Sequence, residues 1–153
     1  MKVVKFGGSS LASATQLEKV FNIVKEDETR QYVVVSAPGK RNAEDTKVTD
    51  ALIKYYKEYT NGKDTSQSQE WIINRYRSIT EDLELNEEII EEIARDIMSL
   101  ATLPKSDNTF LYDTFLASGE NNNAKLIAAY FVKKGLEAKY IHPKDAGIFV
   151  TSE

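Results

Sequence analysis

Two short apolar runs, with an amphipathic segment between them, dominate the first 35 residues. Val3–Phe6 is apolar apart from Lys5, and residues 31–35, QYVVV, are mostly apolar, end in β-branched residues and show no polar alternation. Between them, apolar side chains recur with the spacing of one helix face: Leu17, Val20, Phe21 and Val24. Ser13 followed by Gln16 predicts a capping box at the start of this helix. The pattern predicts a β-α-β unit with parallel strands, the second of them buried on both faces.

The pattern after this unit is mainly helical. Residues 40–45 are polar and predict a mobile loop. Apolar positions beginning at Val48 predict a helix that stops at Asn61–Gly62. Residues 63–106 predict further, peripheral helices, one of them capped by Asn86.

The last third of the chain predicts helices followed by two more strands. Residues 109–117 are helical in pattern, Ser118–Glu120 predicts an interruption, and a new helix is expected from Asn121. Ala138–Ile141 predicts a third strand, and residues 148–150 predict the start of a fourth.

Composition narrows the class of protein. The 153 residues suit one domain, the 41% hydrophobic fraction is enough for a core, and a net charge of -4 argues against a general nucleic-acid binder. There is no cysteine, which excludes disulfides and thiolate chemistry. The chain has no signal-peptide pattern and no run of the roughly 18 apolar residues that span a bilayer. We expect no membrane partner and a cytoplasmic location.

The candidate chemistry begins where the first strand ends, at Gly7 and Gly8. Glycines between a strand and a helix allow the backbone to approach an anion closely, and Lys5 would add a positive charge beside them. An ordinary tight turn is the alternative. Residues 36–39 follow the second strand, so this second turn is expected to share a crevice with the first if the strands are neighbours.

Five stretches, taken together, resemble the aspartate kinases (aspartokinases) of the amino acid kinase fold. Lys5–Ala12, KFGGSSLA, resembles the signature that opens these enzymes, and Val33–Lys40 resembles their second strand and its Ser-Ala turn. Lys47–Ile53, Ser118–Glu120 and Asp145–Thr151 resemble three further segments in the same order. The resemblance therefore spans the whole chain.

The resemblance implies an α/β, three-layer amino acid kinase-like fold with a mainly parallel sheet. Residues 1–153 would be the N-terminal portion of the kinase domain, with a helical subregion at about 63–117. The nucleotide lobe and the ACT regulatory domains of the family are expected to be absent. The parent enzyme is expected to be a homo-oligomer.

The family reaction, as the resemblance implies it, moves the γ-phosphoryl of ATP to the side-chain carboxylate of L-aspartate. It gives 4-phospho-L-aspartate and ADP, the first step toward lysine, threonine and methionine. ATP would bind with Mg²⁺ held by phosphates and water, without a metal site made by the protein. The acceptor carboxylate, with a pKa near 4, is ionised at pH 7, so no general base is needed.

The resemblance also assigns roles to residues. Lys5 would be catalytic, neutralising charge at the transferring group. Contacts with the ATP phosphates are expected from Lys5, Gly7, Gly8, Ser9 and Ser10. Contacts with aspartate are expected from Ser36, Thr49 and Glu120, the last through the ammonium group of the substrate. His142, the only histidine, is expected to be structural or exposed.

Two other functions stay open at this point. One is a different amino acid kinase, for glutamate, acetylglutamate or carbamate, and Ser118–Glu120 and the long helical segment at 63–106 favour the aspartate enzyme over it. The other is a folded but inactive module that binds an anion or a partner without turnover.

Overall fold

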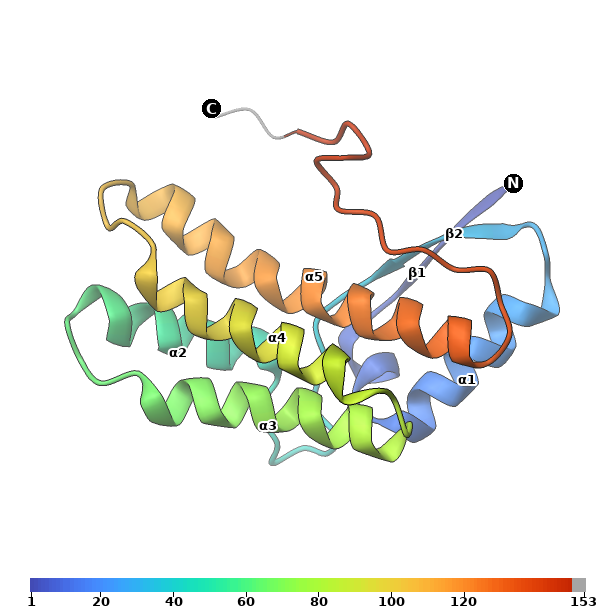
Figure 1. Ribbon diagram of the computed structural model, residues 1–153, viewed down its shortest axis with the longest axis horizontal. Coiled ribbons are helices and arrows are strands. Elements are labelled where there is room, and N and C mark those ends of the chain that lie inside the picture. Colours follow the sequence, from blue (N-terminus) through green and yellow to red (C-terminus); the bar gives the residue numbers. More distant parts are fainter. Residues whose placement is uncertain (150–153) are drawn as a thin grey trace.

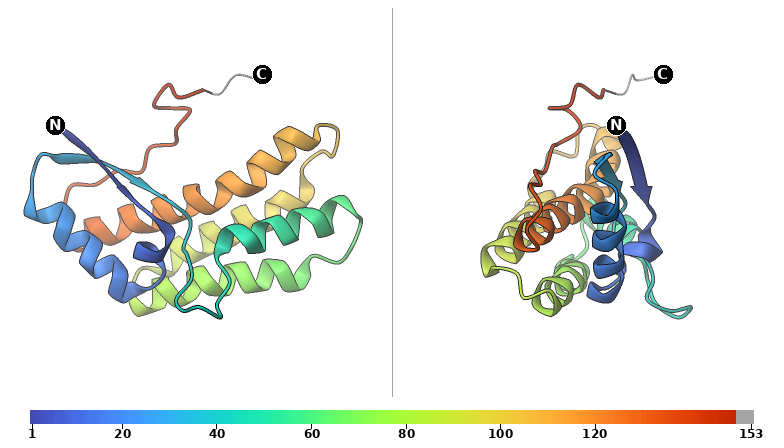
Figure 2. Two further views of the ribbon diagram at one scale, coloured as in Figure 1. Left: turned by 180° about the vertical axis from the view of Figure 1, so that it is seen from behind. Right: turned by 90° about the vertical axis from the view of Figure 1, so that its right-hand side faces the viewer.

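In the part of the chain that the structure describes, a two-stranded parallel sheet with one helix beside it sits at one end of a bundle of four helices. The computed structural model describes residues 1–149. Its elements are β1 (Lys2–Phe6), η1 (Gly8–Leu11), α1 (Ala14–Glu26), β2 (Arg30–Val35), α2 (Val48–Thr60), α3 (Ser66–Asp82), α4 (Glu87–Ser99), η2 (Leu100–Thr102) and α5 (Asn108–Lys133). Helices α2–α5 lie side by side, with β1, β2 and α1 to the right in Figure 1 and to the left in the reverse view of Figure 2.

The predicted β-α-β unit is confirmed. Strands β1 and β2 pair in parallel, with Lys5 opposite Val34. Helix α1 begins after Ser13, whose side chain accepts a hydrogen bond from the Gln16 backbone N–H at 3.4 Å. The buried face of this helix is the predicted one: Leu17, Val20, Phe21 and Val24.

Within residues 1–149 only one face of the sheet is covered, so the prediction of a strand buried on both faces was wrong for the part of the chain that the structure describes. Val33 and Val35 of β2 pack against the hydrophobic core. On the opposite face Val3 is 66% exposed, Tyr32 52% and Val34 46%. The apolar run of β2 predicts burial on both faces, because the residues of a strand alone do not indicate whether a helix covers one face or both.

The helix ends in the bundle follow their local signals. Helix α2 ends at Thr60 with Asn61 as its C-cap, and Gly62 follows with a φ of 67°, a left-handed conformation that suits glycine. Asn86 caps α4, where its side chain accepts from the Glu88 backbone N–H at 3.0 Å. The predicted end of α2 and the predicted cap of α4 are therefore confirmed. Inside the bundle, the buried Tyr55 hydroxyl donates to the Ile97 carbonyl at 2.8 Å.

Helix α5 runs without a break, so the predicted interruption at Ser118–Glu120 was wrong. Gly119 lies in its middle, where a Cβ would meet Ala37 Cβ and the Leu52 side chain at 2.9 Å each. The glycine lets α5 approach these two side chains closely. Gly119, which the sequence suggested as a helix break, is therefore explained by close packing and not by a helix end.

The predicted third and fourth strands are also wrong for the described residues. Residues 136–142 have no regular secondary structure, a turn occupies 143–147, and 148–149 are irregular. Val150 lies outside the described residues. A strand requires backbone hydrogen bonds to a neighbouring strand, and none of the backbone bonds found within residues 1–149 gives Ala138–Ile141 such a neighbour.

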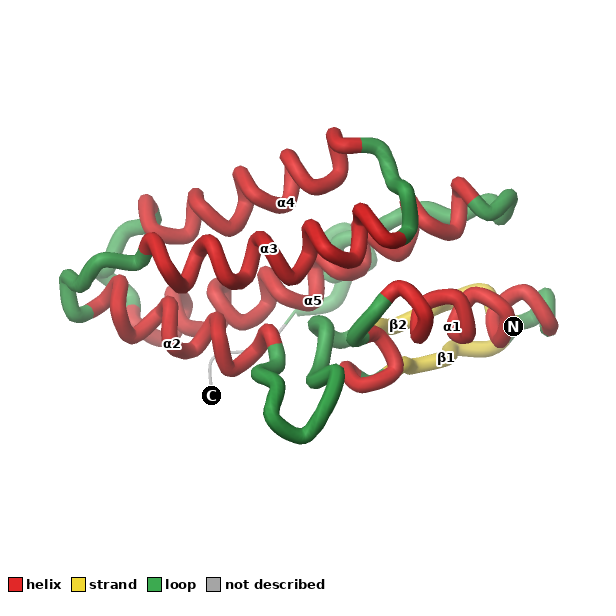
Figure 3. The backbone as a smooth tube through the Cα atoms, turned by 90° about the horizontal axis from the view of Figure 1, so that it is seen from below, coloured by secondary structure: helices red, strands yellow, loops and turns green. Residues whose placement is uncertain are grey.

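The loop between β2 and α2, which the sequence predicts to be mobile at 40–45, is instead tied to its surroundings. Asp45 accepts two hydrogen bonds from the Arg75 guanidinium of α3, at 2.9 and 2.6 Å. Arg41 donates from Nε to the Ala12 carbonyl at 2.9 Å and from Nη2 to Ser78 Oγ at 2.8 Å. This loop projects from the rest of the chain in Figure 3, and these bonds fix both of its arms.

Replacing Asp45 by asparagine should lower the free energy of unfolding by roughly 2 kcal/mol at pH 7, because it leaves the largely buried Arg75 without its charged partner. The Arg75 guanidinium holds the pKa of Asp45 well below its usual value. This depressed pKa means that the stabilisation is fully present above the unfolded pKa of about 3.9 and is lost as the pH falls below it. Urea unfolding at pH 7 and pH 3 measures this.

The stability difference between wild type and Asp45→Asn should therefore shrink at pH 3. Glu44→Gln, which removes the neighbouring and exposed carboxylate, is the matched control and should change little at either pH. An Asp45→Asn effect of the same size at both pH values would contradict the ion pair as its cause.

Candidate active site

A cavity of about 230 Å³ opens at the carboxyl end of β2. Its lining comes from four separate parts of the chain: the turn of η1, the turn after β2, the start of α2 and the middle of α5. The lining residues are Gly8, Ser36, Ala37, Pro38, Gly39, Lys47, Thr49 and Glu120. The site therefore lies where open α/β sheets usually bind ligands.

The two turns that follow the strands touch each other, as predicted from the pairing of β1 and β2. The Gly39 backbone N–H donates to the Gly8 carbonyl at 2.8 Å. A Cβ on Gly39 would lie 2.4 Å from the Gly8 carbonyl carbon and 2.6 Å from the Ser9 nitrogen. Because those atoms are backbone, a glycine at position 39 is what permits the contact.

Ser36 and Thr49 enter the cavity from adjoining elements. Ser36 directly follows β2 and is half-buried, and Thr49 is the second residue of α2. The Val48 backbone N–H donates to the Pro38 carbonyl at 3.1 Å, which joins the start of α2 to the turn after β2. The hydroxyl groups of Ser36 and Thr49 can thus form hydrogen bonds with the same small polar ligand.

Glu120 brings a carboxylate to the same cavity from α5. The close approach of α5 at Gly119 places this helix against the turn after β2. On the bundle side, the buried Tyr76 hydroxyl donates to the Gly119 carbonyl at 2.7 Å. Burial raises the pKa of Tyr76, and the charges of Asp96 and Glu120 raise it further, so the phenol stays a neutral donor.

The structure brings together four of the eight predicted site residues and leaves four outside the cavity lining. Those in the lining are Gly8, Ser36, Thr49 and Glu120; the others are Lys5, Gly7, Ser9 and Ser10. The latter four lie along β1 and the turn beside it. Lys5 is exposed on the open face of the sheet, and a Cβ on Gly7 would meet nothing within 4 Å. This part of the turn is open to a ligand larger than the cavity.

Four of the lining residues were assigned no role from the sequence: Ala37, Pro38, Gly39 and Lys47. Lys47 is the only basic side chain in the lining, and its Nζ lies 3.9 Å from Asp50 Oδ1. Lys47 precedes Thr49 by two residues, and this closeness to a predicted site residue is the one local signal that could have identified Lys47 as part of the site. His142 is exposed as predicted, and its Nδ1 accepts from the Lys144 backbone N–H at 3.1 Å.

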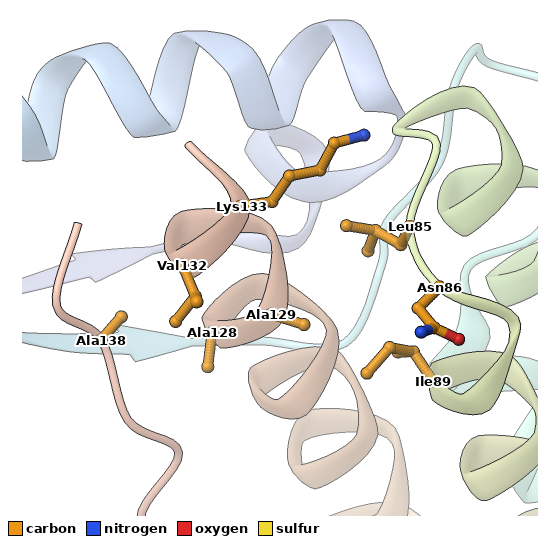
Figure 4. Close-up of a pocket in the computed structure, with 8 residues that line it drawn as sticks. All are labelled: Leu85, Asn86, Ile89, Ala128, Ala129, Val132, Lys133 and Ala138. Atoms are coloured by element: carbon orange, nitrogen blue, oxygen red, sulfur yellow. The ribbon is translucent and has the colours of Figure 1, made fainter. Parts of the chain in front are cut away.

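A second hollow, of about 410 Å³, has a different character (Figure 4). It is mostly apolar, between the start of α4 and the end of α5, and is lined by Leu85, Asn86, Ile89, Ala128, Ala129, Val132, Lys133 and Ala138. Its cation is already engaged, since Lys133 Nζ donates to the carbonyls of Leu83 and Glu84 at 2.8 and 2.7 Å. The convergence of polar groups at the first cavity makes that cavity the candidate active site.

Residues 1–149 hold neither a cluster of metal ligands nor a membrane-spanning helix. No group of three or more acidic, histidine or cysteine side chains is arranged to hold a metal ion there. Within the same residues, no helix combines the length and apolar character needed to cross a membrane.

Comparison with known proteins identifies the class. Residues 1–153 match the model of the amino acid kinase family, and the chain belongs to this family. It is 54% identical to aspartokinase 3 of Bacillus subtilis (strain 168) over 153 residues, which are 100% of this chain and 34% of that protein. The resemblance seen in the sequence is confirmed, and so is the expected fold class.

Solved structures agree. The aspartate kinase of Clostridium acetobutylicum superposes with a TM-score of 0.69 at 31% identity, covering 85% of this chain and 29% of that one. Aspartokinase III of E. coli, in complex with aspartate and ADP, superposes with a TM-score of 0.67 at 23% identity, over 88% and 29% of the two chains. This chain spans about a third of the length of these proteins.

Proposed function

We propose that this chain carries the amino-acid side of an aspartate kinase active site. The observation that carries the proposal is the cavity in which Ser36, Thr49 and Glu120 meet beside Gly8. The 54% identity to a protein named aspartokinase 3 supports it. In the complete enzyme, the side-chain carboxylate of L-aspartate would take the γ-phosphoryl of ATP, giving 4-phospho-L-aspartate and ADP in the cytoplasm.

The polar groups of the cavity suit an amino acid. The carboxylate of Glu120 complements the ammonium group of aspartate, and the hydroxyls of Ser36 and Thr49 donate to carboxylate oxygens. Lys47 adds a positive charge for a substrate that carries two carboxylates. Because the reacting carboxylate is already ionised at pH 7, these residues have to orient it and need not remove a proton.

The open part of the first turn suits the phosphates. The space beside Gly7 leaves room for an oxyanion, and Lys5 and the hydroxyls of Ser9 and Ser10 lie along the same segment. Mg²⁺ fits this donor set when phosphate oxygens and water hold it, and when bound it offsets negative charge on the triphosphate. Lys5 would neutralise further charge as the phosphoryl group moves, which is the largest electrostatic task in such a transfer.

A hybrid enzyme tests the proposal. In it, this chain replaces the matching 153 residues of Bacillus subtilis aspartokinase 3. We expect release of ADP that depends on L-aspartate, at a rate within about tenfold of the unaltered aspartokinase 3, because the exchanged segments are 54% identical. A coupled assay of ADP release measures it, and the mass of the same hybrid in solution tests whether it is a homo-oligomer, as we propose.

L-Glutamate and N-acetylglutamate serve as the competing substrates. Each is longer than aspartate by at least one methylene, and we expect both to give ADP at close to the rate without any acceptor. A hybrid enzyme that melts in one transition yet prefers glutamate would favour another amino acid kinase. One that folds and releases no ADP with any acceptor would favour a binding module without turnover.

A further inference from the structure

Two neighbouring asparagines on α5, Asn122 and Asn123, are buried without being fully satisfied. Both side chains have no exposed surface. Each donates one hydrogen bond from its amide, and within residues 1–149 neither Oδ1 atom has a hydrogen-bond partner. A buried carbonyl without a partner costs on the order of 1–3 kcal/mol, so packing alone does not account for an amide at these positions.

The amide of Asn123 reaches the candidate active site. Its Nδ2 donates to the backbone carbonyl of Ser36 at 2.7 Å, across 87 positions of the chain. Ser36 lies in the turn after β2 and lines the cavity. Asn123 comes about one helical turn after Glu120, which also lines this cavity. One hydrogen bond thus joins the two elements that carry the groups for the substrate.

We propose that Asn123 is a positioning residue for the amino-acid substrate, a role that rests on the proposed function. It holds the turn after β2 against α5 and so fixes the spacing between the Ser36 hydroxyl and the Glu120 carboxylate. Asn123 touches no substrate in this role and acts through Ser36. The loss of this bond should weaken substrate binding more than it weakens folding, because the apolar contacts of α5 remain.

Asn122 provides a matched control on the same helix. It is equally buried, has the same unpartnered Oδ1, and donates from Nδ2 to Asp96 Oδ2 at 2.8 Å. Asp96 belongs to α4, inside the helical bundle, and does not line the cavity. The two amides therefore differ mainly in whether their partner is part of the site.

The experiment compares Asn123→Leu with Asn122→Leu in the 153-residue chain. Leucine has the same branching at Cγ as asparagine and lacks the donor. It is also the larger side chain, so any cost of overpacking falls on both variants and is measured by the Asn122→Leu control. We expect Asn123→Leu to weaken binding of L-aspartate, followed by NMR titration, by at least about tenfold, while Asn122→Leu stays within about twofold of wild type. Urea unfolding of each variant separates this effect from lost stability.

Backbone amide exchange gives a second readout that needs no ligand. Asn123→Leu should speed hydrogen exchange at the backbone amides of Ala37, Gly39 and Lys40 by about tenfold or more, and Asn122→Leu should leave them unchanged. Asn123→Ala replaces Asn123→Leu if the latter does not fold. Equal exchange and equal aspartate affinity in the two variants would overturn the proposal.

The two hypotheses fail in different ways. If wild type binds no L-aspartate, the proposed function fails for this chain, and the exchange comparison alone decides whether Asn123 fixes the turn. If wild type binds L-aspartate and Asn123→Leu binds it equally well, the positioning role is wrong and the proposed function stands.

Discussion

Replacing Lys5 by alanine in the hybrid enzyme is expected to lower turnover by about three orders of magnitude. The reaction brings an anionic carboxylate toward a polyanionic phosphate chain, so its barrier is mainly electrostatic. Lys5 supplies a cation from the end of β1, beside the open part of the first turn. A coupled assay of ADP release at saturating aspartate and ATP measures the loss.

Stability should hardly change in Lys5→Ala. The side chain is exposed, and within residues 1–149 it has neither an ion pair nor a side-chain hydrogen bond. Lys19→Ala, which removes an exposed lysine from α1, is the control and should retain full turnover. If Lys5→Ala kept turnover within about tenfold of the parent, the proposed catalytic role of Lys5 would be wrong.

The elements that the sequence predicted correctly are those with local causes. The spacing of Leu17 and Val20, the capping group of Ser13 and the glycine at position 62 act within one or two helical turns, so they can be recognised without a partner element. The wrong predictions depended on distant contacts. Gly119 resembles a helix break until Ala37 and its surroundings are known to press against it.

The same division holds for strands. Val33 and its neighbours formed the predicted β2 because β1 lies alongside, whereas Ala138–Ile141 has a comparable apolar pattern and forms no strand among the described residues. A strand is stabilised by hydrogen bonds to its neighbour, and the sequence of the strand does not specify whether that neighbour is present. For this reason the apolar pattern alone predicted a strand at Ala138–Ile141 that the described residues do not form.

The candidate site was predictable where sheet topology brings turns together. Ser36 and Gly8 follow adjacent parallel strands, so their proximity follows from the β-α-β unit. Glu120 was predicted only through the resemblance to aspartate kinases, since nothing local connects α5 with these turns. Lys47 and Asn123 were missed because their places depend on the path of a loop and on the rotation of a long helix.

Replacing Gly39 by alanine should give the largest loss of stability, about 3 kcal/mol or more. The new Cβ would fall within 2.4 to 2.7 Å of three backbone atoms of Gly8 and Ser9. Backbone cannot rotate away as a side chain can, so the turn after β2 has to separate from the turn of η1. The hydrogen bond from the Gly39 N–H to the Gly8 carbonyl should be lost with it.

Alanine substitutions at Gly8 and Gly7 provide a comparison for the loss of stability expected in Gly39→Ala. A Cβ on Gly8 would lie 3.0 Å from the Ala37 carbonyl oxygen, which predicts an intermediate loss of about 1 to 2 kcal/mol for Gly8→Ala. Gly7 has a φ of -80° and open space around its Cβ position, so Gly7→Ala should be neutral or stabilise by up to about 0.5 kcal/mol. Urea unfolding of the three variants measures the series.

We expect the loss of stability to decrease in the order Gly39→Ala, Gly8→Ala, Gly7→Ala. This order would link the contact between the two turns to the candidate site. If steric contact between the two turns builds the cavity, NMR titration of L-aspartate should show weaker binding in Gly39→Ala. Binding should stay close to wild type in Gly7→Ala, because Gly7 is not in the cavity lining. Equal stability of Gly39→Ala and Gly7→Ala would mean that the two turns do not need to touch, and the shared cavity would lose its structural basis.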